Sequence, residues 1–254
     1  MAVWKGIIQG PEDLYTDITC SGAYVGGHPV GIIAVDLVYP KLPGNVANAL
    51  TYDFPVLYKM VSFEIEQLFA GDPAIEQMII DAAKELERDG ARCIVGACGY
   101  FAHFQKSVAA AVNVPVFMSS LTQLPLIKLG LKPDQKILVM CASGDSMSQE
   151  FFDKVNANFA DTIIQDVGSM ESFAPIRWGK LTLDNKRLAK DLSELAAKVC
   201  REHPEIGAIL LECSDLPPYA ADIQRATGLP VYDFISLINW VEHAVVQKRY
   251  YGYL

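Results

Sequence analysis

The chain has 254 residues, of which 51% are apolar and 20% charged, and its formal net charge is -9. That length suffices for one large domain or two modest ones, and no apolar stretch approaches the length of a membrane span. The acidic balance and the lack of a Lys/Arg cluster argue against nucleic-acid binding. The amino terminus lacks the basic start and apolar core of a signal peptide, so we expect a soluble, cytoplasmic protein without a membrane partner.

The predicted elements begin after an amino-terminal extension, residues 1–29, which is rich in Gly and polar groups. The apolar run Val30–Val35 predicts a first, buried strand. An Asp-Pro pair at 72–73 then supplies a cap and a first-turn proline, and apolar residues follow at helical spacing until Gly90. We therefore expect a strand followed, after an undefined segment, by an amphipathic helix.

The second half of the chain contains the same kinds of element. Lys136–Cys141 predicts another leading strand, and a helical pattern runs from Asp184 through Val199 until Pro204 closes it. A last helix is expected from about Phe234 to Lys248.

Two further segments repeat each other at a constant offset of 115 residues, without a gap. Ile94-Val-Gly-Ala-Cys98 runs on to Asn113-Val-Pro-Val-Phe117, and Ile209-Leu-Leu-Glu-Cys213 runs on to Gly228-Leu-Pro-Val-Tyr232. Each copy consists of an apolar strand, a Cys-bearing loop, a helix and a second short strand. Such self-similarity indicates an internal duplication.

Alternation of helices with short apolar strands predicts the fold class α/β, with mainly parallel sheets flanked by helices. The duplication predicts two pseudo-symmetric lobes with the active site in the cleft between them. We expect residues 30–118, with the carboxyl-terminal segment of about 234–254, to form lobe one, and residues 119–233 to form lobe two.

The two cysteines at matching positions of the repeat, Cys98 and Cys213, are the candidate catalytic residues. Ligands of parallel sheets gather at the carboxyl ends of the strands, where both cysteines lie, and the following helix start favours a thiolate. Two thiols on opposite sides of one carbon can remove a proton from one face and return another to the opposite face. The other cysteines are expected to pack in the core, or, for Cys20, have no interpretation. No CxxC or His spacing indicates a metal, and no cofactor is expected.

Four segments of the chain carry a family resemblance: Gly31-Ile-Ile-Ala-Val-Asp-Leu-Val-Tyr-Pro-Lys-Leu-Pro-Gly-Asn45, Ala97-Cys-Gly-Tyr-Phe, Val139-Met-Cys-Ala-Ser-Gly144 and Glu212-Cys-Ser-Asp-Leu216. With them, the chain resembles the aspartate/glutamate racemase superfamily over roughly residues 30–245. The resemblance implies a duplicated α/β fold and a homodimer or higher homo-oligomer. It also implies that Cys98 and Cys213 form an acid/base pair.

Residues near the two cysteines are candidates for binding a small carboxylate-bearing substrate. By resemblance, Ser143, Gly144 and Ser214 hold its carboxylate, and Asn45 positions its polar groups. Gly99 leaves room beside Cys98.

Typical family members have Asn-Thr where this chain has Gly99-Tyr100, and Thr where it has Ser214. This departure indicates a larger or less charged substrate than glutamate or aspartate, with Tyr100, Phe101 and Tyr219 lining an apolar pocket.

The predicted function is a cofactor-independent racemase or epimerase that inverts a carbon next to a carboxylate or carbonyl. The substrate would be an amino-acid derivative or a related small acid. Two alternatives stay open: a cis–trans isomerase of an unsaturated diacid that forms a covalent cysteine adduct, and a non-catalytic metabolite-binding relative. Arylmalonate decarboxylases of the superfamily characteristically lack the first cysteine, so the presence of Cys98 favours racemisation or isomerisation.

Overall fold

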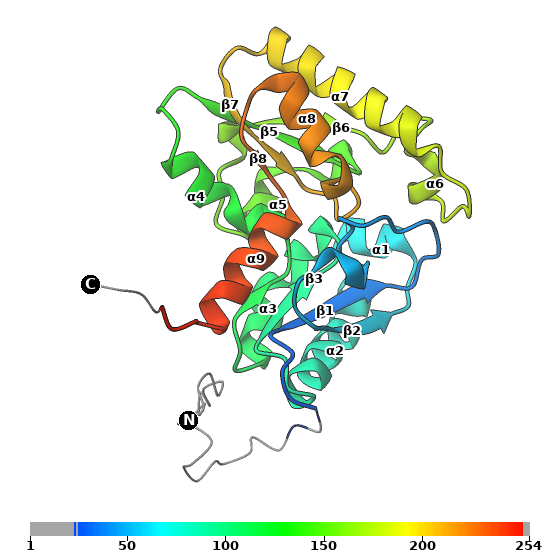
Figure 1. Ribbon diagram of the computed structural model, residues 1–254, viewed down its shortest axis with the longest axis vertical. Helices are drawn as coiled ribbons and strands as arrows, with labels where there is room; N and C mark the ends of the chain where they lie inside the picture. The colour runs from blue at the N-terminus through cyan, green and yellow to red at the C-terminus, as the bar shows by residue number, and fades with distance from the viewer. Residues whose placement is uncertain (1–22, 24, 251–254) are drawn as a thin grey trace.

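The computed structural model describes residues 23 and 25–250, which form two α/β lobes, each built on a four-stranded parallel sheet (Figure 1). The first sheet has the order β2-β1-β3-β4 and the second the order β6-β5-β7-β8. The predicted two-lobed α/β fold is confirmed. The strands are β1 (Val30–Val35), β2 (Val56–Val61), β3 (Cys93–Gly96), β4 (Val116–Phe117), β5 (Lys136–Cys141), β6 (Thr162–Asp166), β7 (Ile206–Leu211) and β8 (Val231–Tyr232).

Helices and short 3-10 turns connect the strands. The α-helices are α1 (Ile65–Ala70), α2 (Glu76–Arg88), α3 (Gln105–Ala111), α4 (Leu124–Leu129), α5 (Gln149–Asp153), α6 (Ala174–Arg177), α7 (Asn185–Glu202), α8 (Ala220–Thr227) and α9 (Phe234–Val245). The 3-10 helix η4 (Gly99–Phe104) follows the first cysteine, and η8 (Pro217–Tyr219) follows the second. Within the described ranges, no helix has the length and apolarity needed to cross a membrane.

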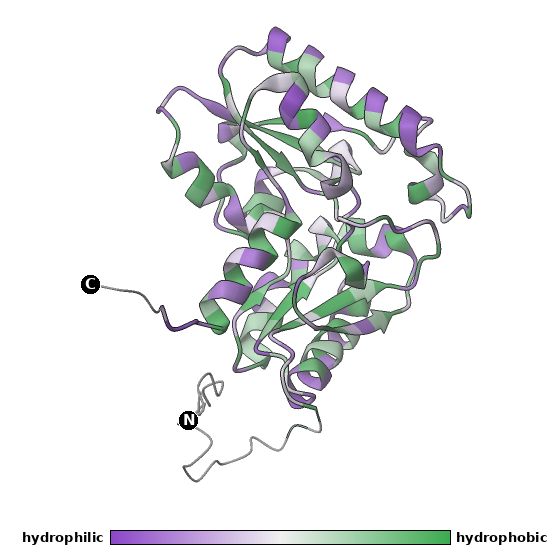
Figure 2. Cartoon of the chain, in the orientation of Figure 1, coloured by the Kyte–Doolittle hydropathy of each residue, from purple (hydrophilic) through white to green (hydrophobic). Residues whose placement is uncertain are grey.

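The two longest predicted helices are present: α7 follows an aspartate cap directly, and α2 follows an aspartate-capped 3-10 turn, Pro73–Ile75. The Asp72 carboxylate accepts a hydrogen bond from the Ala74 N–H at 2.9 Å, in the turn that leads into α2. The Asp184 carboxylate accepts one from the Arg187 N–H at 3.0 Å at the start of α7. These side chains satisfy backbone donors that lack a partner inside the helix. Figure 2 shows polar and apolar residues alternating along the outer helix α7.

The first sheet is covered on both faces, which explains its nearly continuous apolar strands. Ile33 and Ile94 lie in the core shared with α2, whereas Ile32 and Val95 lie in a second cluster with α9. Successive side chains of a strand point to opposite faces, so both sets become buried. The carboxyl-terminal helix thus returns to pack on the first lobe.

The duplication is visible in the strand order and in the short strands β4 and β8, which are separated by the repeat offset. The edge strands β2 and β6 were not predicted. Both are only partly buried, and polar residues such as Lys59 and Gln165 interrupt their apolar character. An edge strand of this kind lacks the continuous apolar run that marks a central one.

Candidate active site

The loops that follow the central strands of both sheets border one pocket with a cavity of about 60 Å³. This volume admits a small molecule of a few heavy atoms, since a single water needs roughly 10–15 Å³ of such space. The pocket lies where parallel sheets gather ligands, at the carboxyl ends of the strands. Its walls consist of Ala34, Val35, Leu37, Tyr39, Lys41, Ala47, Ile65, Phe69, Ala97, Cys98, Ala142, Phe173, Ile176, Arg177, Cys213, Ser214 and Asp215.

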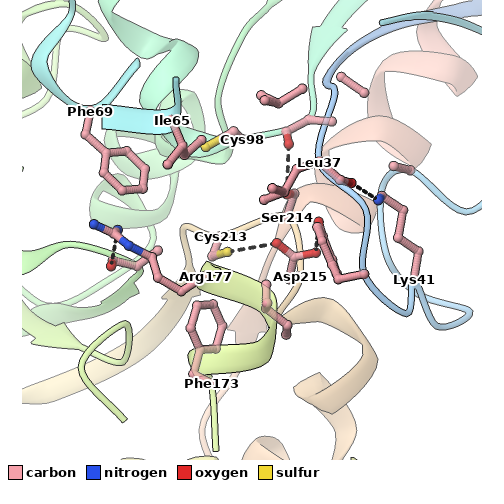
Figure 3. A pocket seen from close by; sticks show the side chains of 17 residues that line it. Leu37, Lys41, Ile65, Phe69, Cys98, Phe173, Arg177, Cys213, Ser214 and Asp215 are labelled. Carbon is pink, nitrogen blue, oxygen red and sulfur yellow. Dashed lines mark hydrogen bonds between the residues drawn. The ribbon is translucent and has the colours of Figure 1, made fainter. Parts of the chain in front are cut away.

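Both candidate catalytic cysteines line this pocket, although they come from different lobes. Cys98 follows β3 and directly precedes η4, and Cys213 follows β7. Cys98 is half-buried, whereas Cys213 is 5% exposed. Figure 3 shows the two side chains on different walls, with Asp215 beside Cys213. The duplicated lobes therefore bring the two thiols to one cavity, while their catalytic role stays a prediction.

A buried hydrogen-bond network holds the Cys213 thiol. Its Sγ donates to Asp215 Oδ2 at 3.4 Å, and the Tyr39 hydroxyl donates to Asp215 Oδ1 at 2.7 Å. The Asn45 amide also donates to Oδ1. Burial raises the pKa of the Asp215 carboxyl, and these three hydrogen bonds lower it. Burial, followed by the Asp215 charge, raises the pKa of Cys213 well above its usual value.

Cys98 lies in a different electrostatic environment. Burial and then the charge of Glu212 raise the pKa of the Cys98 thiol, while the Tyr100 backbone N–H and the Arg177 guanidinium lower it. Neither thiol is acidic in this pocket, because burial raises the pKa of both. A bound ligand that excludes water and brings its own charge therefore has a large influence on which thiol ionises.

Among the predicted substrate-binding residues, Ser214 lines the pocket, and Asn45, Gly99, Ser143 and Gly144 are not among its walls. The Ser214 hydroxyl donates to the Ala97 carbonyl at 2.8 Å and so ties the two cysteine loops together. Asn45 instead supports Asp215. The Gly144 N–H donates to Asp166 Oδ2 at 2.7 Å.

The expectation that Tyr100, Phe101 and Tyr219 line an apolar pocket is wrong. All three are at most 2% exposed, because the 3-10 turn after each cysteine directs them back into the core. The Tyr100 hydroxyl donates to the Ser143 carbonyl at 2.7 Å and accepts from the Ser143 N–H at 2.9 Å. Tyr100 thus orders the Ser143 loop from inside the protein.

The aromatic wall comes instead from residues that the sequence did not single out, namely Tyr39, Phe69 and Phe173. Phe69 and Phe173 lie in segments outside the repeat core, so no motif marked them. Tyr39 lies in the segment from Gly31 to Asn45 that carries the family resemblance, so that segment could have pointed to it.

Two cations belong to the pocket wall. Arg177 ends α6, and its guanidinium lies 4.3 Å from the centre of the Phe69 ring. Its Nη1 donates to the Ala142 carbonyl at 3.3 Å. The Lys41 Nζ lies 4.0 Å from the centre of the Tyr39 ring. Either cation could attract an anionic ligand. In the part of the chain that the structure describes, no group of three or more His, Cys, Asp or Glu side chains could hold a metal ion.

The fold resembles several solved structures. Aspartate racemase from Picrophilus torridus matches with a TM-score of 0.57 and 18% identity, covering 89% of this chain and 96% of that chain. Unliganded arylmalonate decarboxylase matches with a TM-score of 0.56 and 16% identity, covering 85% of this chain and 92% of that chain. At this level of identity, these likenesses establish the fold alone.

Curated proteins with similar sequences carry the name of a lyase. A dimethylsulfoniopropionate lyase from Durusdinium sp. clade D is 33% identical over 232 residues, which is 88% of this chain and 77% of that protein. Dimethylsulfoniopropionate lyase 3 from Emiliania huxleyi is 31% identical over 242 residues, which is 90% of this chain but only 63% of that protein. The expected isomerase activity therefore stays a prediction.

A model of the Asp/Glu/hydantoin racemase family matches residues 61–240, which include both cysteine loops. Together with the duplicated α/β fold, this match shows that the chain belongs to the Asp/Glu/hydantoin racemase family.

Proposed function

We propose that this protein is a lyase that removes the proton next to a carboxylate and expels a leaving group from the neighbouring carbon. Dimethylsulfoniopropionate, the compound named for the similar lyases, is the first substrate to test. The observation that carries the proposal is that Cys98, Cys213 and Arg177 line one small, largely apolar pocket. Such a pocket can combine a thiolate base with a cationic carboxylate anchor.

The chemistry balances without a cofactor. One thiolate takes the proton from the α-carbon, and the electrons of that C–H bond form a double bond to the β-carbon. The C–S bond to a sulfonium on the β-carbon breaks at the same time or directly afterwards. The products are dimethyl sulfide, acrylate and a protonated thiol, which returns its proton to solvent. A cation that holds the carboxylate lowers the barrier, because negative charge grows on the carboxylate as the proton leaves.

The charges and rings of the pocket match both ends of such a substrate. Arg177 is only partly exposed, and its planar guanidinium can hold a carboxylate with two hydrogen bonds. Phe173 lies in the same wall and can attract a sulfonium, because a cation over an aromatic face is attracted by the ring quadrupole. An apolar wall also favours conversion of the charged sulfonium into a neutral sulfide.

The test is to incubate the purified protein with dimethylsulfoniopropionate and measure dimethyl sulfide by gas chromatography. We expect turnover, and a loss of at least about 100-fold in kcat/KM when the thiol that acts as base is replaced in Cys98→Ser or Cys213→Ser. The matched control is Cys200→Ser, which removes a cysteine from helix α7. No sulfide release by the native protein, or full activity in both pocket variants, would refute the proposal.

Racemisation is the second candidate, because two thiols from different lobes line the same cavity. Elimination needs one base, whereas inversion of a carbon needs one group on each face. Chiral 2-substituted acids incubated in deuterated water would then lose optical activity and gain deuterium at the stereocentre. Both Cys98→Ser and Cys213→Ser would abolish inversion, and retained inversion in either variant would exclude the two-base scheme.

A further inference from the structure

Glu212 is a buried carboxyl group that the proposed reaction does not use. It directly precedes Cys213 and is 0% exposed. Its Oε2 accepts a long hydrogen bond, 3.4 Å, from the Ala142 N–H, and its Oε1 has no hydrogen-bond partner. An isolated buried carboxylate is costly, so a group in this position favours its neutral form.

The Glu212 side chain crosses from the second lobe to the loop of the first cysteine. A Cβ atom placed on Gly99 would overlap the Glu212 carboxyl, which shows that the carboxyl packs directly against the residue after Cys98. The same carboxyl contacts the loop after β5 through Ala142. Glu212 therefore lies behind both cysteine loops, although it is not part of the pocket wall.

The groups around Glu212 make its charge state important. Cys98 and Tyr100 approach it from the first lobe, Cys141 from the end of β5, and Cys213 and Asp215 from its own loop. A negative charge on Glu212 raises the pKa of both pocket thiols, and it is the largest electrostatic influence on Cys98. Arg177 acts on Cys98 in the opposite direction.

We propose that Glu212 is a positioning residue that must remain uncharged for the pocket cysteines to form a thiolate, so that its ionisation switches the site off. Burial raises the pKa of Glu212 to about 8, so the carboxyl is mostly protonated at neutral pH and ionises in mildly alkaline solution. Alkaline conditions normally favour thiolates, but here they also ionise Glu212, and its negative charge beside the thiols opposes thiolate formation. As a regulation of the same site, this inference rests on the proposed function, yet thiol ionisation can be measured without turnover.

The first experiment measures alkylation of Cys98 and Cys213 by iodoacetamide between pH 6 and 10, followed peptide by peptide with mass spectrometry. Glu212→Gln keeps a side chain of the size and shape of the protonated carboxyl group, but this side chain cannot ionise. We expect roughly tenfold faster alkylation of Cys98 than in the native protein at pH 9, because a nearby like charge shifts a pKa by about one unit or more. Identical alkylation profiles would overturn the inference.

The second experiment measures the pH dependence of sulfide release. Activity of the native protein should fall above about pH 8, whereas Glu212→Gln should lose this alkaline decline. Glu194→Gln, on the exposed face of α7, is the matched control and should behave like the native protein.

If Glu212→Gln does not fold, Glu212→Met supplies another uncharged side chain of similar length. An alkaline decline retained in the folded variant would overturn the inference. Absence of turnover in every variant would refute only the proposed function, since the alkylation result decides the role of Glu212 independently.

Discussion

Gly99 has no side chain, and this lets the first cysteine loop pack closely against Glu212 of the second lobe. A Cβ there would overlap the buried Glu212 carboxyl, which has little freedom to move. We expect Gly99→Ala to lower the free energy of unfolding by roughly 1–3 kcal/mol, the usual cost of overpacking a core. Chemical denaturation followed by circular dichroism measures this change.

Gly130→Ala is the matched control for this substitution. The nearest atom to a Cβ on Gly130 lies 3.4 Å away, and the residue has a helical backbone with φ of -82°. Its unfolding free energy should change by no more than about 0.5 kcal/mol. Equal stability of the two variants would show that the Glu212 carboxyl yields easily to Gly99→Ala.

The candidate site could be predicted from sequence only where the duplication marked it. Cys98 and Cys213 stand at matching positions of the repeat and do share a pocket. The network of Tyr39, Asn45 and Asp215 could not be derived in this way, because Asp215 is 176 and 170 residues from the other two and meets them only when the lobes pack together. Tyr100 was misplaced because sequence order does not tell which way a 3-10 turn directs a side chain.

Helix α7 illustrates how an amphipathic pattern becomes stability at the scale of an element. Leu192 is fully buried in the second-lobe core, one helical turn from the buried Leu188 and Ala196. We expect Leu192→Ala to lower the free energy of unfolding by about 2–5 kcal/mol, because less apolar surface is buried and a cavity is left in the core. On the opposite side, Lys190 pairs with Glu194 at 3.8 Å and both are exposed.

Lys190→Ala should therefore change the unfolding free energy by less than about 0.5 kcal/mol. Differential scanning calorimetry of the two variants separates the buried from the exposed face. A similar loss in both would contradict the assignment of Leu192 to the core.

Elements with two strong signals were predicted well. Helix α7 combines an aspartate cap with apolar residues at helical spacing, and α2 has the same spacing after an aspartate-capped 3-10 turn. Strands β1, β3, β5 and β7 are apolar runs between turn residues. The edge strands β2 and β6 carry neither signal, because one side of each has no neighbouring strand within the described sheets and their side chains are only partly buried. Their pairing is decided by the tertiary structure and not by local pattern.

At the scale of the whole molecule, the two lobes touch through polar contacts that surround the pocket. The Val46 N–H donates to the Ser214 carbonyl at 3.3 Å, and the Ser214 hydroxyl donates to the Ala97 carbonyl at 2.8 Å. Arg177 lies 3.8 Å from Glu66 across the same junction. A ligand that bridges the two walls therefore adds contacts to a junction that both lobes share.

This arrangement predicts that a carboxylate without a leaving group stabilises the whole fold. Propionate has the expected anchor but cannot eliminate, so it should bind beside Arg177 and raise the Tm. A ligand at 100 times its Kd stabilises by about 2.7 kcal/mol, which corresponds to a shift on the order of 5–10 °C for a chain of this size. Calorimetry in matched sodium chloride separates binding from ionic strength.

Arg177→Gln should abolish most of the propionate-induced shift in Tm. Arg187→Gln, which replaces an exposed arginine on α7, should leave it unchanged. An equal propionate shift in the Arg177→Gln protein would mean that the carboxylate is held elsewhere, and Lys41 would then be the next cation of the pocket to replace.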